Sequence, residues 1–290
     1  MCTPAQPSPP GCDTVGTVRW RVIPVILGAT LLTACDGGAA AVRQQPETSS
    51  PPSRTASSPA SATSAPATSA TPAGKAMVVV LDPGHNGGNA ANPSVINKPV
   101  PAGRGATKPC NTTGTATNAG YGEHAFNWDV ARRVGGELSA KGVRVVFTRD
   151  SDTGVGPCVD RRAALGNEAH ADAVVSIHAD GSEAAGAHGF HVAYSDPPLN
   201  SAQGQPSYLL AQALRDGLRK AGFGVSNYLG SDGLAPRSDL AGLNLSTRPA
   251  ALVECGNMRD TGEATLMSTA DGRQRYADAI TAAILSYLGD

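Results

Sequence analysis

The sequence is poor in aromatic residues and in long hydrophobic runs. Only 4% of its 290 residues are aromatic, and Trp20 is the only aromatic residue before Tyr121. A core needs large apolar side chains, so we expect the folded unit to be smaller than the chain. No apolar stretch reaches 18 residues, which excludes a conventional membrane-spanning helix. The net charge of −1 gives no reason to expect a nucleic acid as a partner.

A short apolar run near the start of the chain predicts an export signal. Arg19 and Arg21 precede residues 22–32, which are too few to span a bilayer but suit the apolar region of a signal peptide. The run leads into Leu-Thr-Ala-Cys at residues 32–35, which resembles a bacterial lipobox. We therefore expect residues 1–35 to be a signal peptide and Cys35 to carry a lipid anchor. An ordinary secretory signal with an incidental cysteine is the alternative.

Residues 36–75 are mostly Pro, Ala, Ser and Thr, and they predict a disordered linker. Such a segment buries too little apolar area to offset the backbone entropy lost on folding. A signal, an acylated cysteine and a tether describe a domain in the cell envelope, either anchored to the membrane or secreted. Export also places the domain in an oxidising compartment.

From Lys75 onward, strand and helix patterns alternate. Residues 77–82 form a continuous apolar run, as a buried parallel strand requires, and they end at a Pro-Gly turn. This alternation predicts one α/β domain over residues 76–290, with a mainly parallel, mixed and twisted sheet of about six strands and helices on both faces. We expect strands at 77–82, 143–148, 173–179, 189–195 and 250–255, and helices at 123–141, 161–170, 207–221 and 271–288.

Three ionisable residues follow or end predicted strands. His85 comes after the first strand, His178 ends the strand at 173–179, and Glu254 ends the strand at 250–255. In open α/β sheets the ligand site collects at the carboxyl ends of the strands, so these side chains are candidates for a functional site. Glu123, at the start of a predicted helix, could reach the same edge.

Two histidines and one carboxylate are a common catalytic zinc set, with water in the fourth position. Zinc lowers the pKa of that water to about 7, and a second carboxylate is then needed to move protons. His85, Glu123 and His178 as ligands, with Glu254 as the base, fill each role once. The alternative is that one or more of them are core or capping residues with no chemical role.

The remaining histidines are given structural roles. We expect His124 to point away from the candidate metal, because the side chain of the preceding residue, Glu123, faces that metal. His170 ends a predicted helix and is expected to cap it or face solvent. His188 and His191 flank the strand at 189–195 and are predicted to be surface residues, although either could line the cleft.

These motifs together resemble the zinc-dependent N-acetylmuramoyl-L-alanine amidases, in particular their short mycobacterial-type members. The resemblance covers about residues 77–288 and implies cleavage of the amide between N-acetylmuramic acid and L-alanine of the stem peptide by zinc-activated water. It also implies zinc ligands at His85, Glu123 and His178 and catalysis by Glu254. The matching stretches are Leu-Asp-Pro-Gly-His at 81–85, Thr-Arg-Asp at 148–150, Ser-Ile-His-Ala at 176–179 and Glu-Cys-Gly-Asn-Met-Arg at 254–259.

The sequence departs from the family pattern at few places. Asp180 stands where the family usually has Asn, which leaves the role of that position open. Residues 86–120 are rich in Gly, Asn and Pro, and we expect a surface loop that borders the cleft. The sequence shows no peptidoglycan-binding repeat, and we expect the lipid anchor and tether to substitute for one. We expect no inhibitory helix between His178 and Glu254.

The positions of the six cysteines sort them into groups. Cys2 and Cys12 precede the signal, and Cys255 lies in a predicted buried strand as a reduced core thiol. Cys110 and Cys158 lie in loop-like sequence of an exported domain, so we predict that they form a disulfide. Closing that loop should stabilise the fold by roughly 3–4 kcal/mol.

Two other functions stay open at this point. A zinc carboxypeptidase on the same scaffold would need a fixed cation for a terminal carboxylate, for which Arg149, Arg237 and Arg248 are available. A non-catalytic wall-binding module would not need the four site residues, yet the sequence keeps all of them. In either case we expect a monomer that meets peptidoglycan and binds no nucleic acid.

Overall fold

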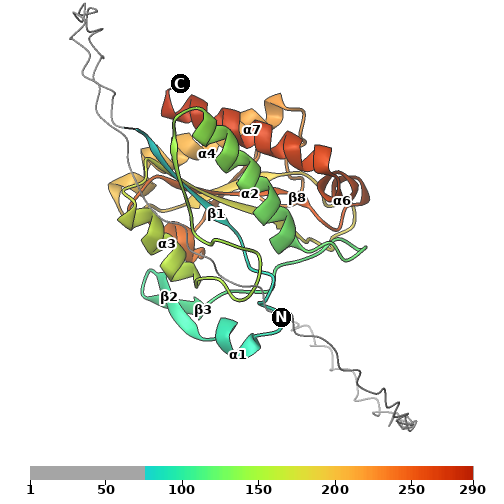
Figure 1. Ribbon diagram of the computed structural model, residues 1–290, viewed down its shortest axis with the longest axis horizontal. Helices are drawn as coiled ribbons and strands as arrows, with labels where there is room; N and C mark the ends of the chain where they lie inside the picture. The colour runs from blue at the N-terminus through green and yellow to red at the C-terminus, as the bar shows by residue number, and fades with distance from the viewer. Residues whose placement is uncertain (1–75, 290) are drawn as a thin grey trace, which may run out of the picture. The chain divides into compact units, whose positions relative to one another are not determined.

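A mixed six-stranded sheet is the centre of the fold (Figure 1). The computed structural model describes residues 76–289. The strand order is β4-β1-β5-β8-β6-β7; the first four strands run parallel, β6 is antiparallel to β8, and β7 is parallel to β6. The predicted mainly parallel, mixed sheet is therefore confirmed. The bounds are β1 Val78–Pro83, β4 Arg144–Phe147, β5 Ala173–Asp180, β6 His191–Ser195, β7 Leu234–Arg237 and β8 Ala250–Asn257.

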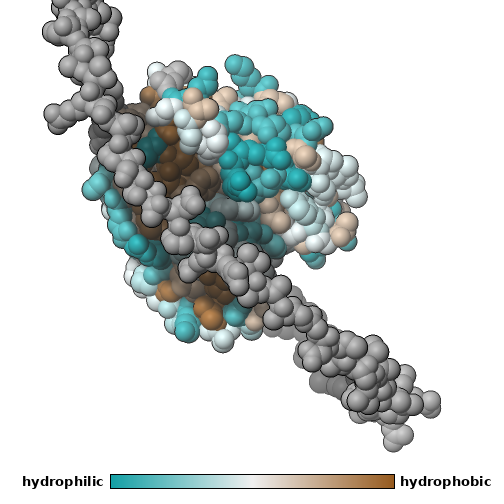
Figure 2. All heavy atoms as spheres, in the orientation of Figure 1, coloured by the Kyte–Doolittle hydropathy of each residue, from teal (hydrophilic) through white to brown (hydrophobic). Residues whose placement is uncertain are grey.

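Three long helices cover one face of this sheet: α2 (Glu123–Ala140), α4 (Gln205–Lys220) and α7 (Ala270–Leu288). In α2 the side chains of Phe126, Val130, Val134 and Leu138 are buried, because a spacing of four residues keeps them on one side of the helix. The outward side of α2 is hydrophilic (Figure 2).

Smaller elements cover the opposite face. They are α3 (Val159–Glu168), the four-residue helix α5 (Ala241–Asn244) and a hairpin of β2 (Pro99–Gly103) and β3 (Ala106–Pro109). Figure 1 shows α3 and the hairpin on the side of the sheet away from α2 and α7. Because strand side chains alternate, Val79 and Leu81 join the large core under α2, whereas Val80 joins a small cluster under α5. Helices on both faces are thus confirmed.

The expectation of a surface loop over residues 86–120 is wrong in part. This segment contains the short helix α1 (Pro93–Ile96) and the β2–β3 hairpin, and Ile96 and Ala102 are buried. The strands are short and include prolines, so period-two alternation is too weak to reveal them. The structure also has four further elements that were not predicted: β7, α5, α6 (Thr261–Ser268) and a 3₁₀ turn at Ser201–Gln203.

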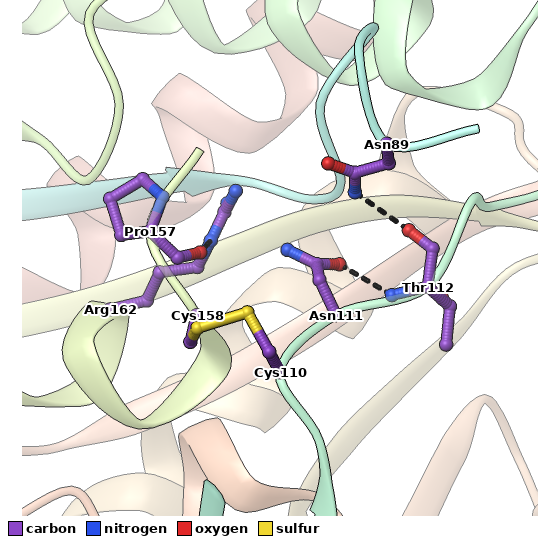
Figure 3. Close-up of a disulfide and its surroundings, with 7 residues drawn as sticks. All are labelled: Asn89, Cys110, Asn111, Thr112, Pro157, Cys158 and Arg162. Atoms are coloured by element: carbon purple, nitrogen blue, oxygen red, sulfur yellow. Dashed lines mark hydrogen bonds between the residues drawn. A yellow bond between two sulfur atoms is a disulfide. The ribbon is translucent and has the colours of Figure 1, made fainter. Parts of the chain in front are cut away.

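A disulfide joins Cys110, just after β3, to Cys158, the residue that precedes α3 (Figure 3). The predicted pairing is confirmed, and it links the hairpin segment to α3. Cys255 is buried and free among the described residues, as expected of a core thiol, and burial raises its pKa.

The predicted signal peptide, the lipid attachment at Cys35 and the linker all lie outside the described residues. None of the described helices is both long and apolar enough to cross a membrane.

Candidate metal centre

The structure brings the four predicted site residues to one end of the parallel strands. His85 follows β1 through the Pro83-Gly84 turn, Glu123 is the first residue of α2, and His178 on β5 is paired in register with Glu254 on β8. His85 itself has a φ of 60°, which is a left-handed conformation that few non-glycine residues adopt. Four segments that are distant in sequence thus meet at one edge of the sheet, as expected for an open α/β sheet.

His85, Glu123 and His178 form a group whose ligand atoms all lie within 4.8 Å of one another. Glu123 stands between the two rings: its Oε2 is 3.2 Å from His85 Nε2, and its Oε1 is 2.9 Å from His178 Nδ1. Ligands of a tetrahedral zinc site, about 2.0–2.2 Å from the metal, are about 3.3–3.6 Å apart. One oxygen of Glu123 and one nitrogen of each histidine lie within 4.8 Å of one another, so these three residues could hold a metal ion.

The ligand atoms are held in place by their own hydrogen bonds. His85 Nδ1 lies 3.1 Å from the carbonyl oxygen of Thr112, which leaves Nε2 to face Glu123. Glu123 accepts hydrogen bonds from the backbone N–H groups of Thr115, at 2.9 Å, and Ala179, at 3.2 Å. These contacts orient the side chains before any ligand binds.

Gly84 allows the close approach of the turn to His178. A Cβ atom at this position would lie 2.1 Å from Cε1 of the His178 ring, a distance at which something must shift. The Gly84 N–H also donates to the Ile177 carbonyl oxygen, at 3.0 Å, which attaches the turn to β5. Glycine is therefore required here by packing against a candidate ligand.

Two carboxyls of the site have opposite pKa shifts. Burial by itself raises the pKa of Glu123, but the charge of His85 and the hydrogen bond from His178 outweigh it, so this pKa is well below the usual range. Burial raises the pKa of Glu254 well above its usual value, and the charges of Glu123 and Asp180 raise it further. Oε2 of Glu254 has no hydrogen-bond partner among the described residues. Such a pair suits one group that stays charged and one that exchanges protons.

Asp82 and Arg162 support the turn and were not singled out by the sequence. Arg162 Nη1 is 2.9 Å from Asp82 Oδ1, and its guanidinium also donates to the carbonyl oxygens of Pro83 and His85. Ser176 donates to Asp82 Oδ2 at 2.6 Å. Burial opposes the charge on Asp82, but these partners lower its pKa to about 2. Asp82 lies within the family motif at 81–85, whereas no local pattern marks Arg162.

The structure corrects one histidine prediction. His191 is buried, not at the surface, and is paired in register with Glu254 across β6 and β8. It is buried because β6 is an interior strand between β8 and β7, and burial lowers the pKa of His191 to about 4. His170 and His188 are exposed, as expected. His124 bonds to Asp152 at 2.7 Å and takes no part in the three-residue group.

Asp180 has a structural role that the sequence left open. Its Oδ1 accepts from the N–H of Gly181 at 2.7 Å, and its Oδ2 accepts from the Tyr228 hydroxyl at 3.0 Å. The carboxylate therefore links the end of β5 to the segment before β7.

The three arginines considered for a carboxypeptidase are engaged elsewhere. Arg149 is buried and donates to Pro83 O and to Asp152. Arg237 forms two hydrogen bonds with Asp239, and Arg248 donates to the carbonyl oxygen of Ala171, just before β5. The structure thus offers none of them as a fixed cation for a terminal carboxylate.

An α/β sheet with a His–Glu–His group and a buried carboxyl at its strand ends is the arrangement typical of metal-dependent hydrolases. The family model described as N-acetylmuramoyl-L-alanine amidase matches residues 79–286. The N-acetylmuramoyl-L-alanine amidase of Mycobacterium tuberculosis is 50% identical over 221 residues, which are 76% of this chain and 90% of that protein.

Solved structures agree with the sequence comparison. The N-acetylmuramyl-L-alanine amidase of Mycobacterium smegmatis matches with a TM-score of 0.71 and 52% identity, over 73% of this chain and 97% of that chain. An N-acetylmuramoyl-L-alanine amidase of Nostoc punctiforme matches with a TM-score of 0.56 and 25% identity, over 74% and 98%. The chain belongs to the N-acetylmuramoyl-L-alanine amidase family, and it is a peptidoglycan hydrolase.

Proposed function

We propose that His85, Glu123 and His178 hold one zinc ion and that Glu254 is the catalytic acid and base of this amidase. The proximity of the three ligand atoms, all within 4.8 Å, carries the proposal. A bound zinc ion would supply Lewis-acid polarisation of the scissile carbonyl and a lowered pKa for water.

Glu254 is suited to move the proton. Glu254 lines the same cavity as His85 and His178, and its Oε2 has no partner among the described residues, so the carboxyl can accept a proton from the attacking water and give it to the departing L-alanine nitrogen. Burial favours the protonated form of Glu254, and a nearby dication would favour the carboxylate. Both protonation states are therefore accessible in one catalytic cycle.

Glu254→Gln separates chemistry from metal binding. The variant should bind zinc in a 1:1 ratio and release no stem peptide from a defined muropeptide, as measured by mass spectrometry of the products. Glu183→Gln, which changes an exposed glutamate, is the matched control and should keep full activity. Chelator should stop the wild type, and added zinc should restore it. Full activity of Glu254→Gln would refute the assignment.

The two other functions receive no specific support. A carboxypeptidase lacks a free arginine among the three considered, and a binding module would not require a buried, unpartnered Glu254. The same mass spectrum distinguishes them, because an amidase releases the whole stem peptide with L-alanine at its N-terminus.

We also propose that the enzyme is exported and held at the membrane by a lipid on Cys35, with residues 36–75 as the tether of a catalytic domain at 76–290. The lipobox-like sequence and the Cys110–Cys158 disulfide, typical of oxidising compartments, support this location. Cys35→Ala should move the protein from the membrane fraction to the soluble fraction. Unchanged partition would contradict the anchor. We expect a monomer in size-exclusion chromatography.

A further inference from the structure

An open groove of about 550 Å³ lies between α2 and the end of β4. Its α2 wall runs from Trp128 to Ser139, a length of roughly 16 Å at the rise of an α-helix. Its other wall is formed by the end of β4, an edge strand of the sheet, and by the residues that follow. The groove shares no lining residue with the cavity that His85 and Glu254 line, so the proposed function does not use it.

Two aromatic side chains form the apolar part of this groove. Trp128 and Phe147 are both half-buried, and the centroids of their rings are 5.9 Å apart. Phe147 packs against the core under α2, whereas Trp128 belongs to neither hydrophobic cluster of the described residues. A large aromatic side chain that is kept at the surface without serving a core is typical of a binding surface.

Two consecutive glycines of α2 leave room beside these rings. A Cβ atom at Gly135 would lie 2.5 Å from the tip of the Phe147 ring, so the missing side chain lets this ring pack directly on the helix. A Cβ atom at Gly136 would meet nothing within 4 Å. Glycine weakens a helix relative to alanine, and no packing contact requires it at Gly136. The open space above Gly136 is part of the groove.

The groove also contains a cation that no acidic side chain neutralises. Arg132 and Asp150 are exposed, and neither has an ion-pair partner within residues 76–289. Arg149, by contrast, is paired with Asp152, and its guanidinium lies over the Trp128 ring, 5.0 Å from the centroid. An unpaired guanidinium suits a ligand with a carboxylate, and an unpaired carboxylate suits hydroxyl donors.

The amidase reaction itself produces a ligand with all of these groups. Hydrolysis of the amide between N-acetylmuramic acid and L-alanine leaves a carboxylate on the lactyl group of each muramic acid. A glycan strand after cleavage therefore carries carboxylates at regular intervals, together with hydroxyl groups and sugar rings. The C–H groups of a sugar ring are polarised positively and pack well on the negative face of an aromatic ring. A groove that is open along its length also admits a polymer that continues beyond it.

We propose that the groove between α2 and β4 binds a glycan strand of peptidoglycan from which the stem peptides have been removed. Sugar rings pack on Trp128 and Phe147. Arg132 pairs with a lactyl carboxylate, and Asp150 accepts hydrogen bonds from sugar hydroxyls. The inference rests on the amidase activity of the proposed function, because that reaction makes the carboxylates, but it adds a binding site outside the metal centre. Such a site keeps the enzyme on a strand that it has begun to cleave, which raises its effective concentration at the next stem peptide.

Trp128 is itself a reporter of binding at this groove. The chain has two tryptophans, so a full-length Trp20→Phe protein has Trp128 as its single tryptophan. Its emission is followed during titration with two soluble probes of equal length: glycan strands without stem peptides, and N-acetylglucosamine oligomers, which carry no carboxylate. The glycan strands should bind about tenfold more tightly than the oligomers, as expected for one charge-assisted hydrogen bond.

Reversal of one charge tests the contact with the carboxylate. Arg132→Glu should weaken binding of the glycan strands by about tenfold and leave binding of the N-acetylglucosamine oligomers unchanged. Lys220→Glu is the matched control, since it makes the same change in net charge at an exposed position of α4 outside the groove, and it should affect neither probe.

A second pair of variants tests the groove by filling it. Gly136→Leu places a side chain in the open space and should abolish binding of both probes, while leucine favours the helix more than glycine does. Ala140→Leu adds a similar side chain at an exposed position of the same helix that does not line the groove, and it should leave binding unchanged.

Activity on two substrates separates the groove from the metal centre. All four variants should cleave a monomeric muropeptide with the kcat/KM of the wild type, because the groove and the cavity at the metal centre share no residue. On polymeric peptidoglycan, Arg132→Glu and Gly136→Leu should lower the rate by about tenfold, since the second point of attachment is lost. The two control variants should keep the wild-type rate on both substrates.

Several outcomes would overturn the proposal. They are no response of Trp128 to the glycan strands, an equal effect of Arg132→Glu on both probes, and an equal loss of activity on monomer and polymer. A change in Trp128 emission on deletion of residues 36–75, with no response to either probe, would overturn it in favour of the chain's own Pro-rich segment. Failure of the wild type to cleave the monomeric muropeptide would instead refute the proposed function, so the two failures are distinguishable.

Discussion

Removal of the Cys110–Cys158 disulfide is expected to lower the free energy of unfolding by about 4 kcal/mol. The two cysteines are 48 residues apart in sequence. The chain-entropy model gives a loss of about 14 cal/mol/K for a loop of this length, which is about 4 kcal/mol at 25 °C. The effect is mainly on the unfolded chain, since the bridge restricts its ensemble.

The double variant Cys110→Ser/Cys158→Ser should be compared with the wild type by urea unfolding. With a slope of about 2–3 kcal/mol/M, a loss of 4 kcal/mol should lower the urea midpoint by about 1.3–2 M. Treatment of the wild type with a reductant should lower its free energy of unfolding by the same amount. This sample controls for any effect of the two serine side chains on packing. A loss below about 1 kcal/mol in both samples would refute the loop-entropy reasoning for this domain.

Other perturbations test the site and its supports. Gly84→Ala should abolish zinc binding, because the new Cβ would lie 2.1 Å from the His178 ring. The metal content of the purified variant measures this, and its circular dichroism spectrum should match that of the wild type. A normal zinc content would contradict the prediction. Asp82→Asn should lower stability by about 2 kcal/mol at neutral pH, since the pKa of Asp82 falls from 3.8 to about 2 on folding. A depressed pKa contributes stability that is present above pH 4 and lost as pH falls through 2. The difference in free energy of unfolding between the wild type and Asp82→Asn should therefore shrink over that range. A constant difference would exclude the ion pair as its cause. His191→Phe should keep the fold and zinc content but shift the pH profile of kcat, because the ring lies beside Glu254; an unchanged profile would show that His191 only fills space.

Local patterns in the sequence were sufficient to predict the main strands and the four site positions. A buried parallel strand is a continuous apolar run, and the first polar residues after the run show where the strand ends. His85, His178 and Glu254 lie at or just beyond such ends. Glu123 could be placed because a helix begins there. The β2–β3 hairpin could not be predicted in the same way, because its stability comes from contacts with α3 and α5 rather than from its own pattern.

By itself, the sequence determined the fold class, the candidate zinc ligands and the likeness to the amidase family, since all of these depend on residue type and spacing along the chain. Only the tertiary structure decided which side chains are buried against which neighbours. The burial of His191 follows from the interior place of β6, and the role of Arg162 follows from its contact with Asp82, 80 residues away in sequence. Burial and pairing depend on distances between segments that are remote in sequence, and no local pattern encodes them.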